Sequence, residues 1–484
     1  MAHHPLVTVM ILCFVGAARG DPPPGVKIIR IVLRPAISPS PALRYPLLPE
    51  LRDQKPGNAV PFYRKANQNQ KAAIAALDDK QWYERIDRWR ELPLDKLPCA
   101  QVHAFFRPFE ASLREVEDGA RHEYADWELT DKLRKMGIGT LLPDIQEARQ
   151  FASLLSLRVR LAMAEGRHND AVRDLQTLFA LARHVAHAPT LINALVGIAI
   201  SNVAAAAVDD LIQQPGMPNL YWSLTDLPQP FIDLRMPLQG ERVGSYGTFP
   251  GLPMSPNADI RPLTPEQVQG YVKLLSGLRR NDGPIPDSAY TIMIALDLQR
   301  KHEKAKQALV DAGWSRSVLE KMPHIEVGVL HGFLDYERQM DDAIKWSSLP
   351  YWQAAPALME LEKRRSKSNL LPGPEEPAYP IADFLAASNG RILFARTRIE
   401  RKIAALRCLE AIRLYAANHD GKLPVSLTDI KVVPIPVDPY TGEPFVYMVT
   451  GEKATLSSAA IASPVPGRKP NPQDALYYEI VLKR

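Results

Sequence analysis

The stretch DIQEARQFASLLSLRVRLAMAEGRHNDAVRDLQTLFALARHVAHAPTLINALVGIAISNVAAAAVDDLIQ, residues 144–213, decides the fold class of this chain. Its apolar side chains recur every three or four residues, which is the spacing of an amphipathic helix. Breaks at Glu165-Gly166-Arg167 and at Pro189 divide the stretch into predicted helices at 144–164, 169–186 and 190–213. Three long consecutive helices predict a mainly α protein.

Two environments fit the third of these helices. Residues 190–208 are a run of 19 uncharged residues, which is long enough to cross a bilayer. The run also contains Thr190, Asn193 and Ser201, and the two amphipathic helices before it need a partner to cover. A helix that is apolar all round is equally typical of a buried central helix. We therefore expect a buried helix and no membrane span at 190–208.

Helical periodicity continues on both sides of this stretch and predicts a helical domain over residues 63–377. Residues 214–263 are rich in proline and glycine and are expected to be mostly irregular. The other helices are predicted at 71–92, 107–123, 264–279, 288–311, 327–346 and 351–364.

The C-terminal part, residues 378–484, has a different pattern. A long helix is predicted at 381–418, with an apolar stripe and with Arg396, Arg401 and Arg407 on its other faces. Runs at 445–449, 454–458 and 475–482 predict short strands. The predicted fold is thus mainly α: an irregular helical array followed by a small C-terminal α+β module.

The N-terminus predicts export. Residues 6–18 are an apolar run of 13 residues, followed by the small residues of a signal-peptidase site before Asp21, although no Lys or Arg precedes the run. We expect residues 1–20 to be a signal peptide and the mature chain to be periplasmic or secreted; a retained anchor is the alternative. Residues 21–62 contain ten prolines and predict an extended arm with one edge strand at 26–33.

Composition narrows the class of partner. Lys and Arg number 59 and Asp and Glu 54, a net charge of +5 that is too small and too mixed to indicate nucleic acid as a partner.

Removal of the signal peptide leaves two cysteines, Cys99 and Cys408. In an oxidising compartment they could form a disulfide, but two buried unpaired thiols are the expectation.

No motif in the chain assigns a catalytic, cofactor-binding or metal-binding residue. The sequence contains no phosphate-binding loop, nucleophile elbow, HExxH or CxxC. The pair His184 and His187, and the group His324, Glu326 and His331, are expected to be solvated or core side chains. The adjacent acids at 209–210 and 341–342 are expected on a wet surface, because neighbouring helical residues face different ways.

Two further features suggest local roles. Asp438, before Pro439, is expected to shape a turn with its side chain, with a calcium site as the alternative. The aromatic residues near 221–222 and 346–352 could line a groove, although core packing is the stronger expectation for them.

Three resemblances accompany these patterns. Residues 164–171 (AEGRHNDA) resemble the turn of a tetratricopeptide hairpin, but the period is not sustained, so only an isolated hairpin is implied. Residues 414–424 (LYAANHDGKLP) and 436–447 (PVDPYTGEPFVY) resemble the globular domain of type II secretion major pseudopilins, which implies a helix, a turn and a small sheet without filament formation. Segments at 41–51, 56–59, 164–171, 189–192 and 219–228 resemble a group of exported planctomycete proteins, a likeness that implies a fold and export but no activity.

These observations lead to two hypotheses about function. The first is an exported, non-enzymatic protein-interaction or assembly component with a protein partner in the cell envelope. The second is a hydrolase or small-ligand-binding protein with a site in the helical domain, formed by scattered residues of the segment 240–263.

Overall fold

Three consecutive helices lie at the centre of the protein, as predicted. The computed structural model describes residues 24–483, apart from 78–80, 143, 254, 257–260, 262, 278–286, 367–388 and 461–469. The central helices are α6 (Ile145–Ala164), α7 (His168–Ala186) and α8 (Leu191–Leu211). Thr190 caps α8 by accepting a hydrogen bond from the backbone N–H of Asn193. The predicted signal peptide and residues 378–388 lie outside the described residues.

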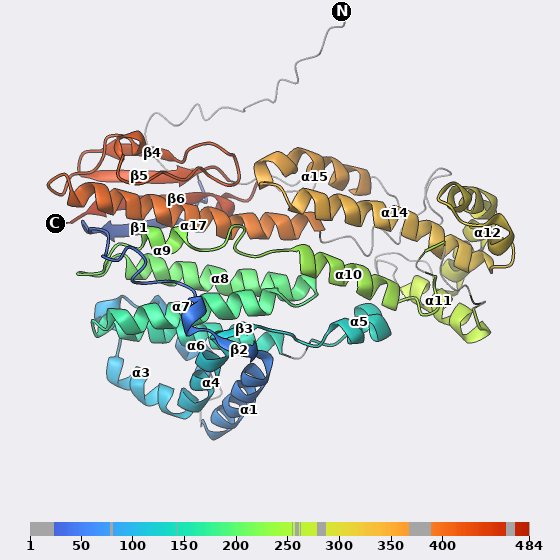
Figure 1. Cartoon of the computed structure of the whole chain (residues 1–484), viewed down its shortest axis with the longest axis horizontal. Coiled ribbons are helices and arrows are strands. Elements are labelled where there is room, and N and C mark those ends of the chain that lie inside the picture. Colours follow the sequence, from blue (N-terminus) through green and yellow to red (C-terminus); the bar gives the residue numbers. More distant parts are fainter. Residues whose placement is uncertain are drawn as a thin grey trace, which may run out of the picture.

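The apolar helix α8 is enclosed by other helices. It packs against α6 and α7 on one side and against α17 (Asn389–Ala417) on the other, and Figure 1 shows α7, α8 and α17 stacked with their axes nearly parallel. Among the described residues, α8 is the helix that is long and apolar enough to cross a membrane, and 67% of its most apolar window is buried inside the protein. Helix packing thus covers most of its apolar surface.

Most of the remaining helices lie below this stack or extend to its right in Figure 1. Those before it are α1 (Val60–Ala76), α2 (Trp82–Glu91), α3 (Cys99–Phe106), α4 (Glu110–Ala120) and α5 (Thr130–Met136). Those after it are α9 (Tyr221–Thr225), α10 (Arg235–Gly247), α11 (Pro265–Gly277), α12 (Asp287–Asp311), α13 (Arg316–Leu319), α14 (His324–Ser347) and α15 (Tyr351–Ser366).

One of the sequence-based expectations for helices is wrong and another is incomplete. The single helix predicted at 71–92 is replaced by α1 and α2. The described part of the segment 214–263 is mostly irregular, as expected, but it also contains α9 and α10. The glycines of α10 permit close packing rather than turns. At Gly240 a Cβ atom would lie 1.9 Å from the carbonyl oxygen of Pro189. Glycine content alone therefore misidentified a helix as a loop.

A four-stranded sheet covers the C-terminal half of α17 (Figure 1). Its order is β1-β6-β5-β4, formed by β1 (Ile28–Leu33), β4 (Val446–Thr450), β5 (Lys453–Ser458) and β6 (Leu476–Leu482). The strand β1 pairs in parallel with β6, with Ile31 opposite Ile480, so the proline-rich N-terminal segment supplies an edge strand to the C-terminal module. A separate pair joins β2 (Lys55–Asn58) to β3 (His122–Tyr124). The fold is mainly α with a small C-terminal α+β module, as predicted.

Several arginines of α17 are buried although they lie off the predicted apolar stripe. Arg396 and Arg401 are buried, and both donate hydrogen bonds to backbone carbonyls, Arg396 to Ser347. Arg413 is fully buried beside Glu410 and donates to the carbonyl oxygens of Met217 and Arg34. These side chains are buried because helices cover α17 on one side and the sheet covers it on the other. A helix covered on both sides has no solvent-facing stripe for its arginines to occupy.

Candidate functional site

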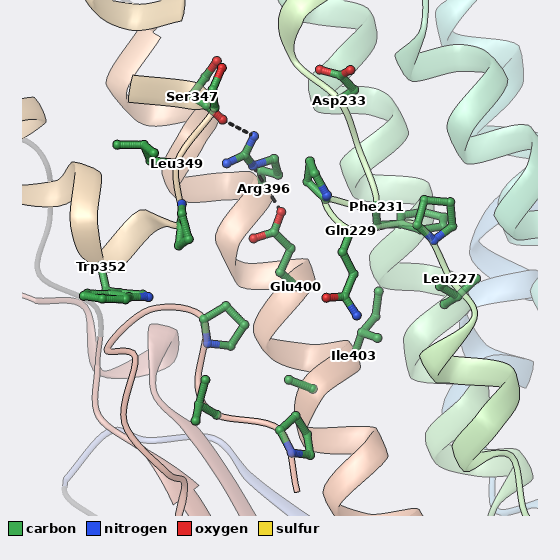
Figure 2. A pocket seen from close by; sticks show the side chains of 18 of the residues that line it. Leu227, Gln229, Phe231, Asp233, Ser347, Leu349, Trp352, Arg396, Glu400 and Ile403 are labelled. Carbon is green, nitrogen blue, oxygen red and sulfur yellow. Dashed lines mark hydrogen bonds and ion pairs between the residues drawn. The ribbon is translucent and has the colours of Figure 1, made fainter. Parts of the chain in front are cut away.

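A pocket of about 680 Å³ lies along one face of α17, and we call it the α17 cleft. Figure 2 shows its floor on α17 and its walls on three other segments. The walls are residues 227–235 between α9 and α10, residues 347–352 at the corner between α14 and α15, and residues 436–439 of the C-terminal module. None of the lining residues comes from 240–263, the segment in which a site was expected.

The floor follows about three turns of α17. Its lining residues are Arg396, Glu400, Ile403, Ala404 and Arg407. Positions separated by three or four residues share one helix face. At a rise of 1.5 Å per residue, the distance from position 396 to position 407 is roughly 16 Å. The cleft is therefore elongated, and its length is set by a single rigid helix.

Prolines form much of the cleft walls. The lining prolines are Pro228, Pro230, Pro350, Pro436 and Pro439. Proline fixes its own φ angle and restricts the residue before it, so these walls lose little freedom when something binds. The walls are preorganised, which lowers the entropy cost of binding.

Trp352 is the exposed aromatic residue of the cleft. It is 45% exposed, and Figure 2 shows its ring beside the opening, across from the side chain of Glu400. The adjacent Tyr351 is buried and stacks on Tyr440 of the C-terminal module, with 5.1 Å between ring centroids. Tyr351 thus packs the C-terminal module against α15, which agrees with the expectation of core packing. Trp352 lines the cleft, which agrees with the alternative of a groove.

The charged groups at the centre of the cleft are paired with each other. Arg396 Nε lies 3.2 Å from Glu400 Oε1, one helical turn away (Figure 2). Burial raises the pKa of the Glu400 carboxyl, and the positive charge of Arg396 partly opposes that rise. At the mouth, Arg235 forms a hydrogen-bonded ion pair with Asp233 and lowers the pKa of that carboxyl against the opposing effect of burial.

Arg407, at the end of the floor, has a different environment. Its guanidinium carbon lies 5.4 Å from the ring centroid of Tyr221, and its Nη2 is 3.4 Å from the Tyr221 hydroxyl oxygen. That hydroxyl donates its own proton to the carbonyl oxygen of Pro434. Within the described part of the chain, the buried Nε of Arg407 has no hydrogen-bond partner.

Asp438 lies next to the cleft wall and organises its turn. Its side chain accepts hydrogen bonds from the backbone N–H of Tyr440 and from the hydroxyl of Ser458. Its backbone carbonyl accepts from the N–H of Gly442 at 2.8 Å. Both carboxylate oxygens are thus bound by protein donors. The described residues contain no group of three or more His, Cys, Asp or Glu side chains that could hold a metal ion.

The other side chains singled out in the sequence do not line the cleft. Cys99 is half-buried and Cys408 is buried, both are free thiols, and burial raises the pKa of the Cys408 thiol to about 12. His184 Nδ1 lies 2.7 Å from the hydroxyl oxygen of Tyr63, and burial lowers its pKa to about 4. Glu326 is fully buried, and neither of its carboxylate oxygens has a hydrogen-bond partner within the described residues.

The sequence-based expectation of a wet surface is wrong for Asp209. Asp209 is buried, forms an ion pair with Lys402 and accepts a hydrogen bond from Tyr478. Its neighbour Asp210 forms an ion pair with the buried Arg160. The sequence around residues 209–210 does not indicate these contacts, because the partner side chains come from α6, α17 and β6.

The α17 cleft combines rigid apolar walls, one exposed indole and a floor with one carboxylate and two guanidinium groups. This combination is suited to holding a ligand that has both an apolar body and a polar group. No protein-family model, curated protein or solved structure matches this chain.

Proposed function

We propose that this protein is a non-enzymatic binding component of the cell envelope, and that its α17 cleft holds an extended segment of a partner protein. The observation that carries the proposal is the length and rigidity of the cleft. A floor of roughly 16 Å matches about five residues of extended chain. Apolar walls and an aromatic side chain are how proteins commonly hold extended, proline-containing segments. The export signal expected at residues 1–20 and the pseudopilin-like pattern of the C-terminal module support a location in the envelope.

A small-ligand-binding role is the second candidate. The cleft volume of about 680 Å³ is also within the usual range for a small-molecule pocket. The two functions differ in whether the bound molecule extends past the ends of the cleft. An extended protein segment continues beyond both ends of the cleft, whereas a small molecule is enclosed within it.

Site-specific crosslinking in cells distinguishes the two. A photo-crosslinking amino acid replaces Val437, which lines the cleft and is 47% exposed, and in a matched control it replaces Val425, which is 83% exposed in the same module. We expect one or two reproducible envelope proteins to be crosslinked at 437 and not at 425, and the yield at 437 to fall when Trp352→Ala is added. Absence of protein adducts at 437, under conditions where a known envelope pair is recovered, would overturn the proposal in favour of a small ligand.

A further inference from the structure

The charges of the α17 cleft are not evenly balanced. Glu400 is paired with Arg396, and Asp233 is paired with Arg235. Arg407 also lines the cleft, and within the described residues it has an aromatic ring and a hydroxyl beside it but no carboxylate. Within the described part of the chain, one positive charge at the end of the floor therefore has no counter-ion.

The immediate surroundings of Arg407 hold the guanidinium in place without neutralising it. The face of Tyr221 attracts the cation. The hydroxyl of Tyr221 gives its proton to Pro434, so its oxygen lone pair can face Nη2. The buried Nε remains without an acceptor. Because the Arg407 side chain is half-buried and only partly satisfied by the protein, an acceptor that a ligand brings to its terminal nitrogens would gain more here than at an exposed arginine.

We infer that Arg407 is the anchor for a carboxylate carried by the occupant of the cleft. This inference rests on the proposed function and adds the chemistry of the partner, an acidic extended segment. A guanidinium presents its donors in a planar fork that matches the two oxygens of a carboxylate. The carboxylate is that of an Asp or Glu side chain within the segment, because the segment continues beyond both ends of the cleft. Prolines and the indole of Trp352 hold the rest of the segment, and Arg407 fixes its register.

Three pools of synthetic pentapeptides test the inference with the full mature chain. All are N-acetylated, with non-acidic residues at the variable positions. The first has a central Glu and a C-terminal amide, the second a central Gln and an amide, and the third a central Gln and a free C-terminal carboxylate. Binding is measured by equilibrium dialysis. We expect the first pool to bind about tenfold more tightly than the second and the third. Tighter binding of the third pool alone would assign the carboxylate to a C-terminus and overturn the side-chain anchor.

Variants of the protein show whether Arg407 is responsible. Arg407→Gln should remove the preference for the carboxylate pool, and Arg407→Lys, which keeps the charge but not the fork, should retain only part of it. Arg398→Gln is the matched control, because it removes an arginine of the same helix that does not line the cleft and is already paired with Asp474. We expect it to leave the preference unchanged.

The outcomes separate this inference from the proposed function. Equal binding of all three pools, reduced by Trp352→Ala, would support a peptide-binding cleft and overturn the role of Arg407. A carboxylate preference that persists in Arg407→Gln would also overturn it. If no pool binds while crosslinking at position 437 still recovers a partner, the function stands and the carboxylate anchor is wrong. The Arg407→Lys variant keeps the test decisive if Arg407→Gln fails to fold.

Discussion

The hydroxyl of Tyr478 donates a hydrogen bond of 2.8 Å to Oδ1 of Asp209, across 269 positions in the chain. Lys402 contacts both groups through its ammonium nitrogen. The three side chains come from the sheet, the central helix and the long C-terminal helix. Together they join the N-terminal helical stack to the C-terminal module at one buried point.

Breaking this cluster should destabilise the whole protein. We expect Asp209→Asn to lower the free energy of unfolding by about 3 kcal/mol, because it leaves the mostly buried Lys402 without its counter-ion. Tyr478→Phe should cost about 1 kcal/mol, because the ion pair remains. Urea unfolding followed by circular dichroism measures both. The control Asp341→Asn removes an acid whose side chain is 73% exposed and should change the value by less than about 0.5 kcal/mol. Equal effects at 209 and 341 would contradict the assignment.

Periodicity was enough to predict the central helices but not their surroundings. These three helices were predicted from apolar spacing and from the breaks at 165–167 and at Pro189, because those signals are local. The burial of Asp209 could not be predicted, because the sequence around an aspartate does not indicate whether its carboxylate contacts water or a distant residue such as Lys402. The buried arginines of α17 were missed for the same reason, because their acceptors are carbonyls from distant segments.

The cleft was only partly predictable. A groove was the weaker of the two expectations for the aromatics near 346–352, and Trp352 does line one. The four segments that form the walls and floor are far apart in the sequence, and no local pattern indicates that they meet. The edge strand at 26–33 was predicted, whereas its parallel pairing with the last strand of the chain was not. Pairing between strands that are far apart in the sequence depends on the packed core of the folded protein.

The turn at the cleft wall provides a test of local packing. Gly442 has a φ angle of +76°, and a Cβ atom there would lie 2.9 Å from the indole of Trp352. We expect Gly442→Ala to cost about 2 kcal/mol, from backbone strain together with displacement of the ring. Gly451→Ala is the matched control, because its φ angle is +63° and nothing lies within 4 Å of the added atom. It should cost about 1 kcal/mol, and thermal unfolding of the two variants measures the difference. An equal loss would show that Trp352 does not constrain the turn.

Cys99 and Cys408 should differ in reactivity. Thiolate is the reactive form, so the buried Cys408, with its pKa raised to about 12, should resist alkylation at pH 8. The half-buried Cys99 should react more than tenfold faster. Iodoacetamide labelling of the native protein followed by peptide mass spectrometry measures both rates, and unfolding in urea should equalise them. A disulfide-linked peptide containing both residues would contradict the structure, as would fast labelling of Cys408 in the native state.

The buried carboxyl of Glu326 should make stability depend on pH. Burial raises its pKa to about 7 from the usual 4.5. Below pH 4.5 the group is protonated in both the folded and the unfolded chain. Between pH 4.5 and pH 7 the unfolded chain releases the proton while the folded chain keeps it, so stability falls as pH rises through this window, by up to about 3 kcal/mol.

Glu326→Gln isolates this contribution, because an amide stays neutral at every pH. We expect the variant to match the natural chain near pH 4.5 and to be more stable than it above pH 7, with a higher urea midpoint. Glu320→Gln, at an exposed position four residues past the start of α13, is the control and should leave the pH profile unchanged. Profiles for Glu326→Gln and the natural chain that stay parallel from pH 4.5 to pH 8 would mean that a donor satisfies the Glu326 carboxylate when it ionises.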